Sequence, residues 1–92
     1  AGRKAPTDIL VAHTRGAPYN LVRETAHTLR SRGFKVEQYH EDRKLNAQLK
    51  YAGEKGIPWV WFPPTEEDGE HQVKNSASRD QVLADPATWM PE

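Results

Sequence analysis

The stretch at residues 57–62 (IPWVWF) is the most apolar part of the chain, and it decides the fold. As a strand it would be hydrophobic on both faces, which is typical of a central strand covered on its two sides. Pro63 and Pro64 follow at once and end the strand, because proline has no N–H to donate to a ladder. The sequence therefore predicts a buried strand in the middle of a sheet with a layer on each face.

Four further strands are predicted, two before this stretch and two after it. Upstream, residues 8–13 (DILVAH) form a short apolar run, and residues 34–39 (FKVEQY) alternate apolar and polar side chains. Downstream, residues 71–75 (HQVKN) and 80–84 (DQVLA) are short and are expected to be peripheral strands. The sheet would then have a strong central part and a weaker margin.

Two helices are predicted between the first three strands. The first is expected over residues 18–32, with Pro18 at its first position and Gly33 as its C-cap. The second is expected between a cap at Asp42 and an end at Gly56. Apolar residues at helical spacing give each helix one buried stripe: Leu21, Val22, Ala26 and Leu29, then Leu45, Leu49 and Ala52. With right-handed crossovers, this order of elements predicts a parallel three-stranded core.

The chain is long enough for one domain. We expect a linker at residues 1–7, which suggests a fragment of a larger protein, and a single domain at residues 8–92 of the 92. Trp89 and Met90 are expected to hold the tail at residues 86–91 onto the body. No apolar run approaches the roughly 20 residues that a membrane helix needs. Cysteine is absent, which excludes disulfides and Cys-ligated metals and fits a reducing cytoplasm.

The zero net charge hides an uneven distribution. Residues 1–50 hold ten of the thirteen Lys and Arg and five of the thirteen Asp and Glu, which gives +5, and residues 51–92 carry the balancing −5. A wholly basic coat for nucleic acid is excluded, whereas a local basic face remains open, as does ordinary solvated charge.

Motifs of catalysis and of cofactor binding are missing. The chain has neither G-x-x-x-x-G-K-[ST] nor G-x-G-x-x-G, and it has no G-x-S-x-G elbow. His13 and His40 each end a predicted strand at the carboxyl edge of the sheet, where α/β sheets bind ligands. A metal or an acid–base pair there is weighed against histidines bonded to solvent or backbone, and we favour the second interpretation. No cofactor is expected for this chain.

The start of the second helix suggests an RNA-binding site. Arg43 and Lys44 stand where the helix already carries partial positive charge, so cations and exposed amides together would attract an anion. Gln48, one turn later, offers an amide for a base edge, and Tyr39 offers a stacking face. Arg15 would lie on the same edge of the sheet. Surface decoration is the alternative for each residue taken alone.

The segment at residues 44–62 (KLNAQLKYAGEKGIPWVWF) resembles the anticodon-binding domain of class IIa aminoacyl-tRNA synthetases, and most closely that of histidyl-tRNA synthetases. The similarity rests on a Leu-x-x-Gln-Leu-Lys-Tyr-Ala segment followed by Gly-Ile-Pro, matched here by Leu45, Gln48, Leu49, Lys50, Tyr51, Ala52, Gly56, Ile57 and Pro58. It extends over about residues 8–91, and the ending is similar to that of actinobacterial members. The resemblance implies a three-layer α/β/α fold with a five-stranded mixed sheet flanked by helices.

The resemblance also implies a function. The domain would bind the anticodon loop of histidine tRNA, while a separate catalytic domain of the same parent chain carries out ATP-dependent histidylation. Intact enzymes of this family are cytoplasmic homodimers that use ATP and histidine, and neither ligand is expected to bind here. The fragment would have no catalytic site although it belongs to a ligase. The residues expected to contact RNA are Arg43, Lys44 and Gln48 first, then Arg15, Tyr51, Lys74, Arg79 and Gln81.

Two departures from the family pattern stand out. Pro63 and Pro64 replace a glycine that often follows the third strand. Residues 78–81 read Ser-Arg-Asp-Gln where Ser-Gly-Glu-Gln is common, so Arg79 implies either a different turn conformation or an added cation near RNA.

Two other functions are kept as alternatives. The first is a synthetase-like domain reused for protein contact or regulation without RNA binding, which the neutral net charge would suit. The second is a small flavodoxin-like enzyme with a small-molecule pocket at the strand ends.

Overall fold

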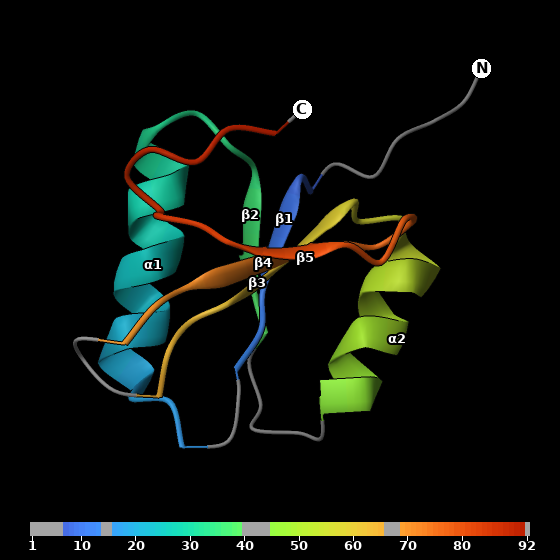
Figure 1. Ribbon diagram of the computed structural model, residues 1–92, viewed down its shortest axis with the longest axis horizontal. Coiled ribbons are helices and arrows are strands. Elements are labelled where there is room, and N and C mark those ends of the chain that lie inside the picture. Colours follow the sequence, from blue (N-terminus) through green and yellow to red (C-terminus); the bar gives the residue numbers. More distant parts are fainter. Residues whose placement is uncertain (1–6, 14–15, 40–44, 66–68, 92) are drawn as a thin grey trace.

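The computed structural model describes residues 7–13, 16–39, 45–65 and 69–91. In this part of the chain five strands form one sheet in the order β2-β1-β3-β4-β5, and one helix covers each of its faces (Figure 1). The elements are β1 Ile9–Val11, α1 Tyr19–Ser31, β2 Val36–Gln38, α2 Leu45–Lys55, β3 Trp59–Phe62, β4 Gln72–Asn75 and β5 Gln81–Leu83. The predicted α/β class and the five-stranded mixed sheet are confirmed.

The sheet is parallel in its first half and antiparallel in its second. β1 pairs in parallel with β2 and with β3, whereas β4 pairs antiparallel with β3 and with β5. The apolar stretch at residues 57–62 therefore contains the central strand of the sheet, β3, as its two hydrophobic faces predict. Its register places Val60 opposite Lys74, and Lys74 opposite Gln81. Paired residues share a face of a sheet, so these three side chains lie on one side.

The α1 layer covers one face of the sheet. Val22, Ala26 and Leu29 are buried in one cluster that includes Trp61 of β3. Burial of a side chain such as Val22 or Leu29 stabilises the fold by about 1.5–3 kcal/mol relative to exposure. The helix begins one residue later than expected: Pro18 has an extended ψ of 133° and serves as the N-cap. Its missing N–H is harmless there, and its carbonyl accepts the N–H of Val22 at 3.2 Å.

The α2 layer covers the opposite face. Ala52 and Ile57 are buried against Leu10 and Val60, and Leu49 packs on them while partly exposed. The helix ends at Gly56, whose φ of 72° lies in the left-handed region that glycine tolerates best. The predicted end is confirmed, whereas the predicted cap at residue 42 lies outside the described residues.

The tail packs on the α1 side of the sheet through one aromatic side chain. The ring of Trp89 lies 5.1 Å from that of Trp59 and 5.5 Å from that of Trp61, in edge-to-face geometry. Arg32 of the α1 end donates from Nη1 to the carbonyl of Pro86 at 2.8 Å. The expectation for Trp89 is confirmed. Met90 is 64% exposed, so it does not tuck in, and its sulfur only accepts a bond from Arg32.

The packed body includes the last residue of the expected linker. Thr7 is buried and its hydroxyl donates to the carboxylate of Glu37 on β2. The remainder of that linker lies outside the described residues. Neither α1 nor α2 has the length and the apolar character needed to span a bilayer.

Candidate nucleic-acid interface

A groove with three basic side chains lies between α2 and the turn that joins β4 to β5. We call it the α2 groove. Its volume is about 440 Å³. Lys50 enters it from α2, Lys74 from β4 and Arg79 from the turn, above a floor formed by Leu49 and Val60. Three positive groups from three elements thus converge on one surface of the domain. The lining residues are Asn46, Leu49, Lys50, Gly53, Val60, Lys74, Ser76 and Arg79.

Helical spacing and strand register explain why these residues meet. Asn46, Lys50 and Gly53 follow one another at i, i+4 and i+7, so they occupy one flank of α2. Lys74 is paired with Val60, whose side chain belongs to the core beneath α2, so it lies on the same side of the sheet. Because α2 covers β1 and β3, the outer part of that face is left open beside it.

Among the described residues, the charged side chains that line the α2 groove are all basic. Glu54, one turn after Lys50 on α2, is exposed and lies outside this lining. Asp80, next to Arg79 in sequence, lines a different groove together with Trp59 and Trp89 of the α1 side. Lys and Arg side chains attract anions, and arginine can bind two phosphate oxygens at once.

Gln48 has a different place from the one expected. It is fully buried, its Oε1 accepts the backbone N–H of His13 at 2.7 Å, and its Nε2 donates to the carbonyl of His13 at 2.9 Å. The expectation of a surface amide that reads a base edge is therefore corrected. The amide connects α2 to the end of β1, and burying it is tolerated because its polar atoms are hydrogen-bonded.

Tyr51 lies on the flank of α2 that faces β2, away from the α2 groove. Its hydroxyl donates to Glu37 at 2.7 Å, and its ring meets that of Tyr39 edge-on at 5.6 Å. The hydrogen bond from Thr7, followed by that from Tyr51, lowers the pKa of Glu37. The same bond to Glu37 raises the pKa of Tyr51. Both polar groups are thus engaged within the domain.

The other expected contact residues fall into two sets. Gln81 stands opposite Lys74 on the α2 side of the sheet and is hydrogen-bonded to Gln72, but it lines a separate pocket with Pro63 and Glu70. Lys74 and Arg79 both line the groove. Three expected residues and one of the strand-end histidines lie outside the described residues: Arg15, Arg43, Lys44 and His40.

Two residues of the α2 groove were missed by the sequence reasoning. Lys50 was considered only as part of a family motif, and Asn46 was not considered. Their spacing of four residues, continued by Gly53, was the available signal. It marks a helix flank that is polar and has little bulk, which suits a surface where something else approaches.

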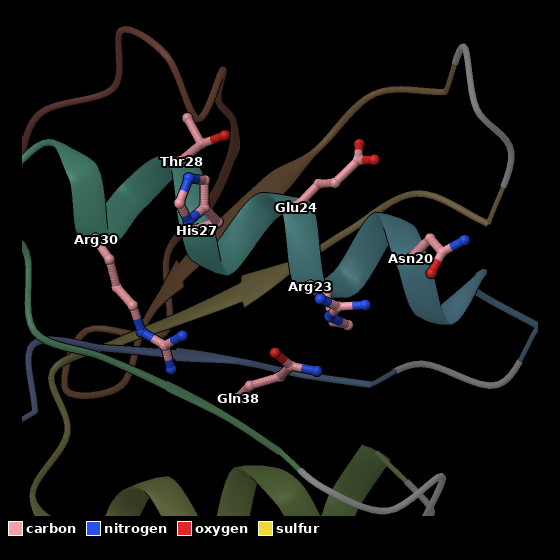
Figure 2. A pocket seen from close by; sticks show the side chains of 7 residues that line it. All are labelled: Asn20, Arg23, Glu24, His27, Thr28, Arg30 and Gln38. Atoms are coloured by element: carbon pink, nitrogen blue, oxygen red, sulfur yellow. The ribbon is translucent and has the colours of Figure 1, made fainter.

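A second groove, of about 670 Å³, lies on the other side of the sheet between α1 and β2 (Figure 2). Arg30 extends from α1 toward β2, where its Nε and Nη2 donate to the carbonyl of Val36 at 3.2 and 3.0 Å. Glu24 lies on the opposite side of α1 from Gln38. This groove is lined by an acid as well as by bases: Asn20, Arg23, Glu24, His27, Thr28, Arg30 and Gln38. Its mixed charge makes it the weaker candidate for a polyanion.

Metal chemistry finds no site in the part of the chain that the structure describes, since no three His, Asp or Glu side chains gather there. His71 is engaged in the core, where its Nδ1 accepts the N–H of Trp61 at 3.0 Å. Its burial lowers its pKa, against a smaller opposite effect of Asp85. The convergence of Lys50, Lys74 and Arg79 supports binding of an anion in the α2 groove.

The fold and the α2 groove together define an α/β domain with a basic groove on one face of its sheet. A family model described as "Anticodon binding domain" matches residues 8–88, and the chain belongs to this family. Its curated relatives include the histidine–tRNA ligase of Thermobifida fusca, 46% identical over 96% of this chain, and that of Micrococcus luteus, 39% identical over 99%. The chain spans about a fifth of the length of each: 20% in both cases.

Solved structures agree on the fold. The histidyl-tRNA synthetase from Nostoc sp. PCC 7120 superposes with a TM-score of 0.75 at 23% identity, over 89% of this chain and 20% of that one. The RNA binding domain of threonyl-tRNA synthetase from Cryptosporidium parvum superposes with a TM-score of 0.77 at 14% identity, over 88% of this chain and 21% of that one. The resemblance drawn from residues 44–62 is thus confirmed, and these relatives give no support to a reused, RNA-free domain.

Proposed function

We propose that this domain holds the anticodon loop of histidine tRNA for a catalytic domain carried elsewhere in its parent polypeptide. The observation that carries the proposal is the α2 groove, where Lys50, Lys74 and Arg79 converge, on a member of the anticodon-binding domain family. The identity of the curated relatives supports histidine tRNA as the ligand.

The chemistry of the surface suits a single-stranded loop. The cations would neutralise phosphates, which supplies affinity that falls as salt rises. Polar groups beside them, the amides of Asn46 and Gln81, would bond the edges of unstacked bases, which supplies specificity. The basic residues Arg15, Arg43 and Lys44 are proposed as further phosphate contacts.

The parent protein is proposed to be a cytoplasmic homodimeric histidine–tRNA ligase that uses ATP and histidine. The domain contributes recognition to that reaction, and its own part involves no cofactor and no catalytic residue. ATP and histidine are proposed to bind the catalytic domain alone.

A binding measurement tests the proposal. The chain is titrated against histidine tRNA and against a tRNA with another anticodon, at 50 and 200 mM salt. We expect a preference for histidine tRNA of about tenfold, which one well-placed base contact supplies. Equal affinity for the two tRNAs at both salt concentrations would overturn anticodon recognition.

Two double variants locate the surface. Lys50→Ala/Lys74→Ala should reduce the slope of log affinity against log salt by about 2, because each phosphate contact contributes about 1. Arg43→Ala/Lys44→Ala should weaken binding of both tRNAs alike. Arg23→Ala/Lys35→Ala removes the same charge from exposed positions outside the α2 groove and serves as the matched control. An equal loss in the control would show that only net charge matters.

A further inference from the structure

The turn between β4 and β5 holds an arginine in a backbone conformation that suits glycine. Arg79 has a φ of 67°, and it is the one non-glycine residue with positive φ among the described residues. In this region the Cβ atom crowds the backbone, so a side chain there is disfavoured. The conformation is imposed by the turn, in which the N–H of Arg79 donates to the carbonyl of Asn75 at 2.8 Å.

Asn75 determines this turn without help from the arginine side chain. Its Oδ1 accepts the N–H groups of Ala77 and Ser78 at 2.8 and 2.9 Å, and its own N–H donates to the carbonyl of Asp80 at 2.9 Å. These bonds, together with the N–H of Asp80 that donates to the hydroxyl of Ser78 at 3.3 Å, close the connection without the guanidinium of Arg79. Any residue that accepts positive φ would complete it, and glycine or asparagine would do so with less strain.

No contact of the Arg79 guanidinium within the described part of the chain offsets that strain. Among the described residues the guanidinium makes no hydrogen bond and no ion pair, and the residue is exposed. It lines the α2 groove beside Lys74 and across from Lys50 of α2. Strained residues that lack a structural partner are typical of functional positions, where the side chain acts on a ligand.

We propose that Arg79 is an affinity-determining residue whose guanidinium binds a backbone phosphate of the RNA in the α2 groove, together with Lys74 and Lys50. This inference rests on the proposed function and names the ligand group at that site. A phosphate is the group that fits, because the two ammonium groups and the planar guanidinium offer only donors and full positive charge. A guanine edge can accept from one such donor, whereas a phosphate backbone supplies the repeated negative charge that three cations in one groove match.

The proposal predicts effects of opposite sign on stability and on binding. Arg79→Gly removes the strain and the cation together, so the variant should unfold at the same or a higher urea concentration than the parent. Its affinity for histidine tRNA at 50 mM salt should fall by about fivefold to tenfold, and the salt slope should decrease by about 1. If Arg79 had a purely structural role, its removal would make the domain less stable.

Three variants serve as controls. Arg79→Lys keeps the charge and the strain, and should retain most of the salt slope. Arg79→Asn accepts positive φ without a charge, and should bind as weakly as Arg79→Gly, which separates loss of the cation from gain of flexibility. Arg23→Ala removes one exposed cation from α1 on the other side of the sheet, and should leave the slope unchanged. A parental slope in Arg79→Gly, or an equal decrease in Arg23→Ala, overturns the proposal.

The same experiments distinguish failure of the proposed function from failure of the inference about Arg79. If the parent chain binds histidine tRNA and another tRNA equally, anticodon recognition is refuted. The salt slope of Arg79→Gly, compared with that of the parent, still tests whether Arg79 binds a phosphate. If the parent chain binds neither tRNA, inorganic tripolyphosphate is titrated instead and followed by NMR. Shifts at Lys50, Lys74 and Arg79 that vanish in Arg79→Gly support the anion site. The absence of shifts at these three residues overturns it.

Discussion

The side-chain amide of Gln48 forms two hydrogen bonds with the backbone of one residue, His13, and so joins the first half of α2 to the end of β1. One bond satisfies the N–H of His13 and the other its carbonyl, at the point where the strand ladder stops. A backbone that leaves a sheet in the interior must find such partners, because unpaired polar groups are costly there. The glutamine therefore acts as a local continuation of the sheet.

Replacing Gln48 by leucine tests this role through stability. Gln48→Leu keeps most of the volume but leaves the N–H and carbonyl of His13 unpaired, so unfolding should become easier by about 2–4 kcal/mol. Urea denaturation measures the difference. Gln38→Leu, at a half-buried position of β2, is the matched control and should change stability by less than about 0.5 kcal/mol. Similar values for the two variants would refute the role of the amide.

A glutamate at the same position should make the domain sensitive to pH. A protonated carboxyl in Gln48→Glu donates and accepts as the amide does, whereas the ionised form has lost its donor and is buried. The folded pKa would therefore be raised above the unfolded value of about 4.3. The variant's stability should be greatest below that pH and should fall as pH rises through the folded pKa. Denaturation at several pH values measures this, and a difference from the parent that does not vary with pH would contradict it.

His71 should make the parent domain less stable in mild acid. Burial lowers its pKa below the ordinary value of 6.5, and its Nδ1 must be unprotonated to accept the N–H of Trp61. The folded chain thus binds fewer protons than the unfolded one, so this contribution is present above pH 6.5 and is lost as pH falls through the folded pKa.

The variant His71→Asn keeps an acceptor for Trp61 but does not titrate, so its stability should decline less between pH 7 and 5 than that of the parent. Thermal denaturation across this range is the measurement. His27→Asn, on the exposed side of α1, is the control and should follow the parent. If His71→Asn also follows the parent, the pH dependence has another source.

Tyr51→Phe should remove one of the two hydrogen bonds that lower the pKa of Glu37. The variant lacks the hydroxyl that donates to the carboxylate, so the pKa of Glu37 should rise toward its ordinary value of 4.5. In the parent that lowered pKa adds stability above pH 4.5, which is lost as pH falls through the folded pKa. The variant should therefore show a smaller loss on acidification. NMR titration of the Glu37 carboxyl checks the shift, and an unchanged pKa would mean that the bond from Thr7 suffices.

Most of the fold was predictable because it depends on hydrophobic pattern and turn residues. The two apolar faces of residues 57–62 specify a central strand, and Gly33 and Gly56 mark the helix ends. The errors are small shifts at the ends, such as Pro18, which caps α1 from outside it. Helix propensity does not fix a helix boundary to one residue, because a cap one position earlier or later can satisfy the same unpaired N–H and carbonyl groups.

The site was less predictable, and Gln48 shows why. It lies three residues after Leu45 and four before Ala52, so helical spacing alone places it on the buried stripe. Its polar character suggested a surface role, whereas the backbone of His13 supplies partners inside the domain. The glycine that is common at position 79 in the family left two interpretations for Arg79, and the structure gives this residue the left-handed backbone that glycine favours. A tertiary contact decides the place of Gln48, whereas local bonds of the β4–β5 turn decide the conformation of Arg79.

The hydrogen bonds from Arg30 to the carbonyl of Val36 bear on aggregation of the domain. β2 is the outermost strand on its side of the sheet, and a bare outer strand offers a template to which a strand of another molecule can add. A guanidinium already occupies one carbonyl of that template and surrounds it with positive charge. Concentrated preparations should consequently resist fibril growth through this margin.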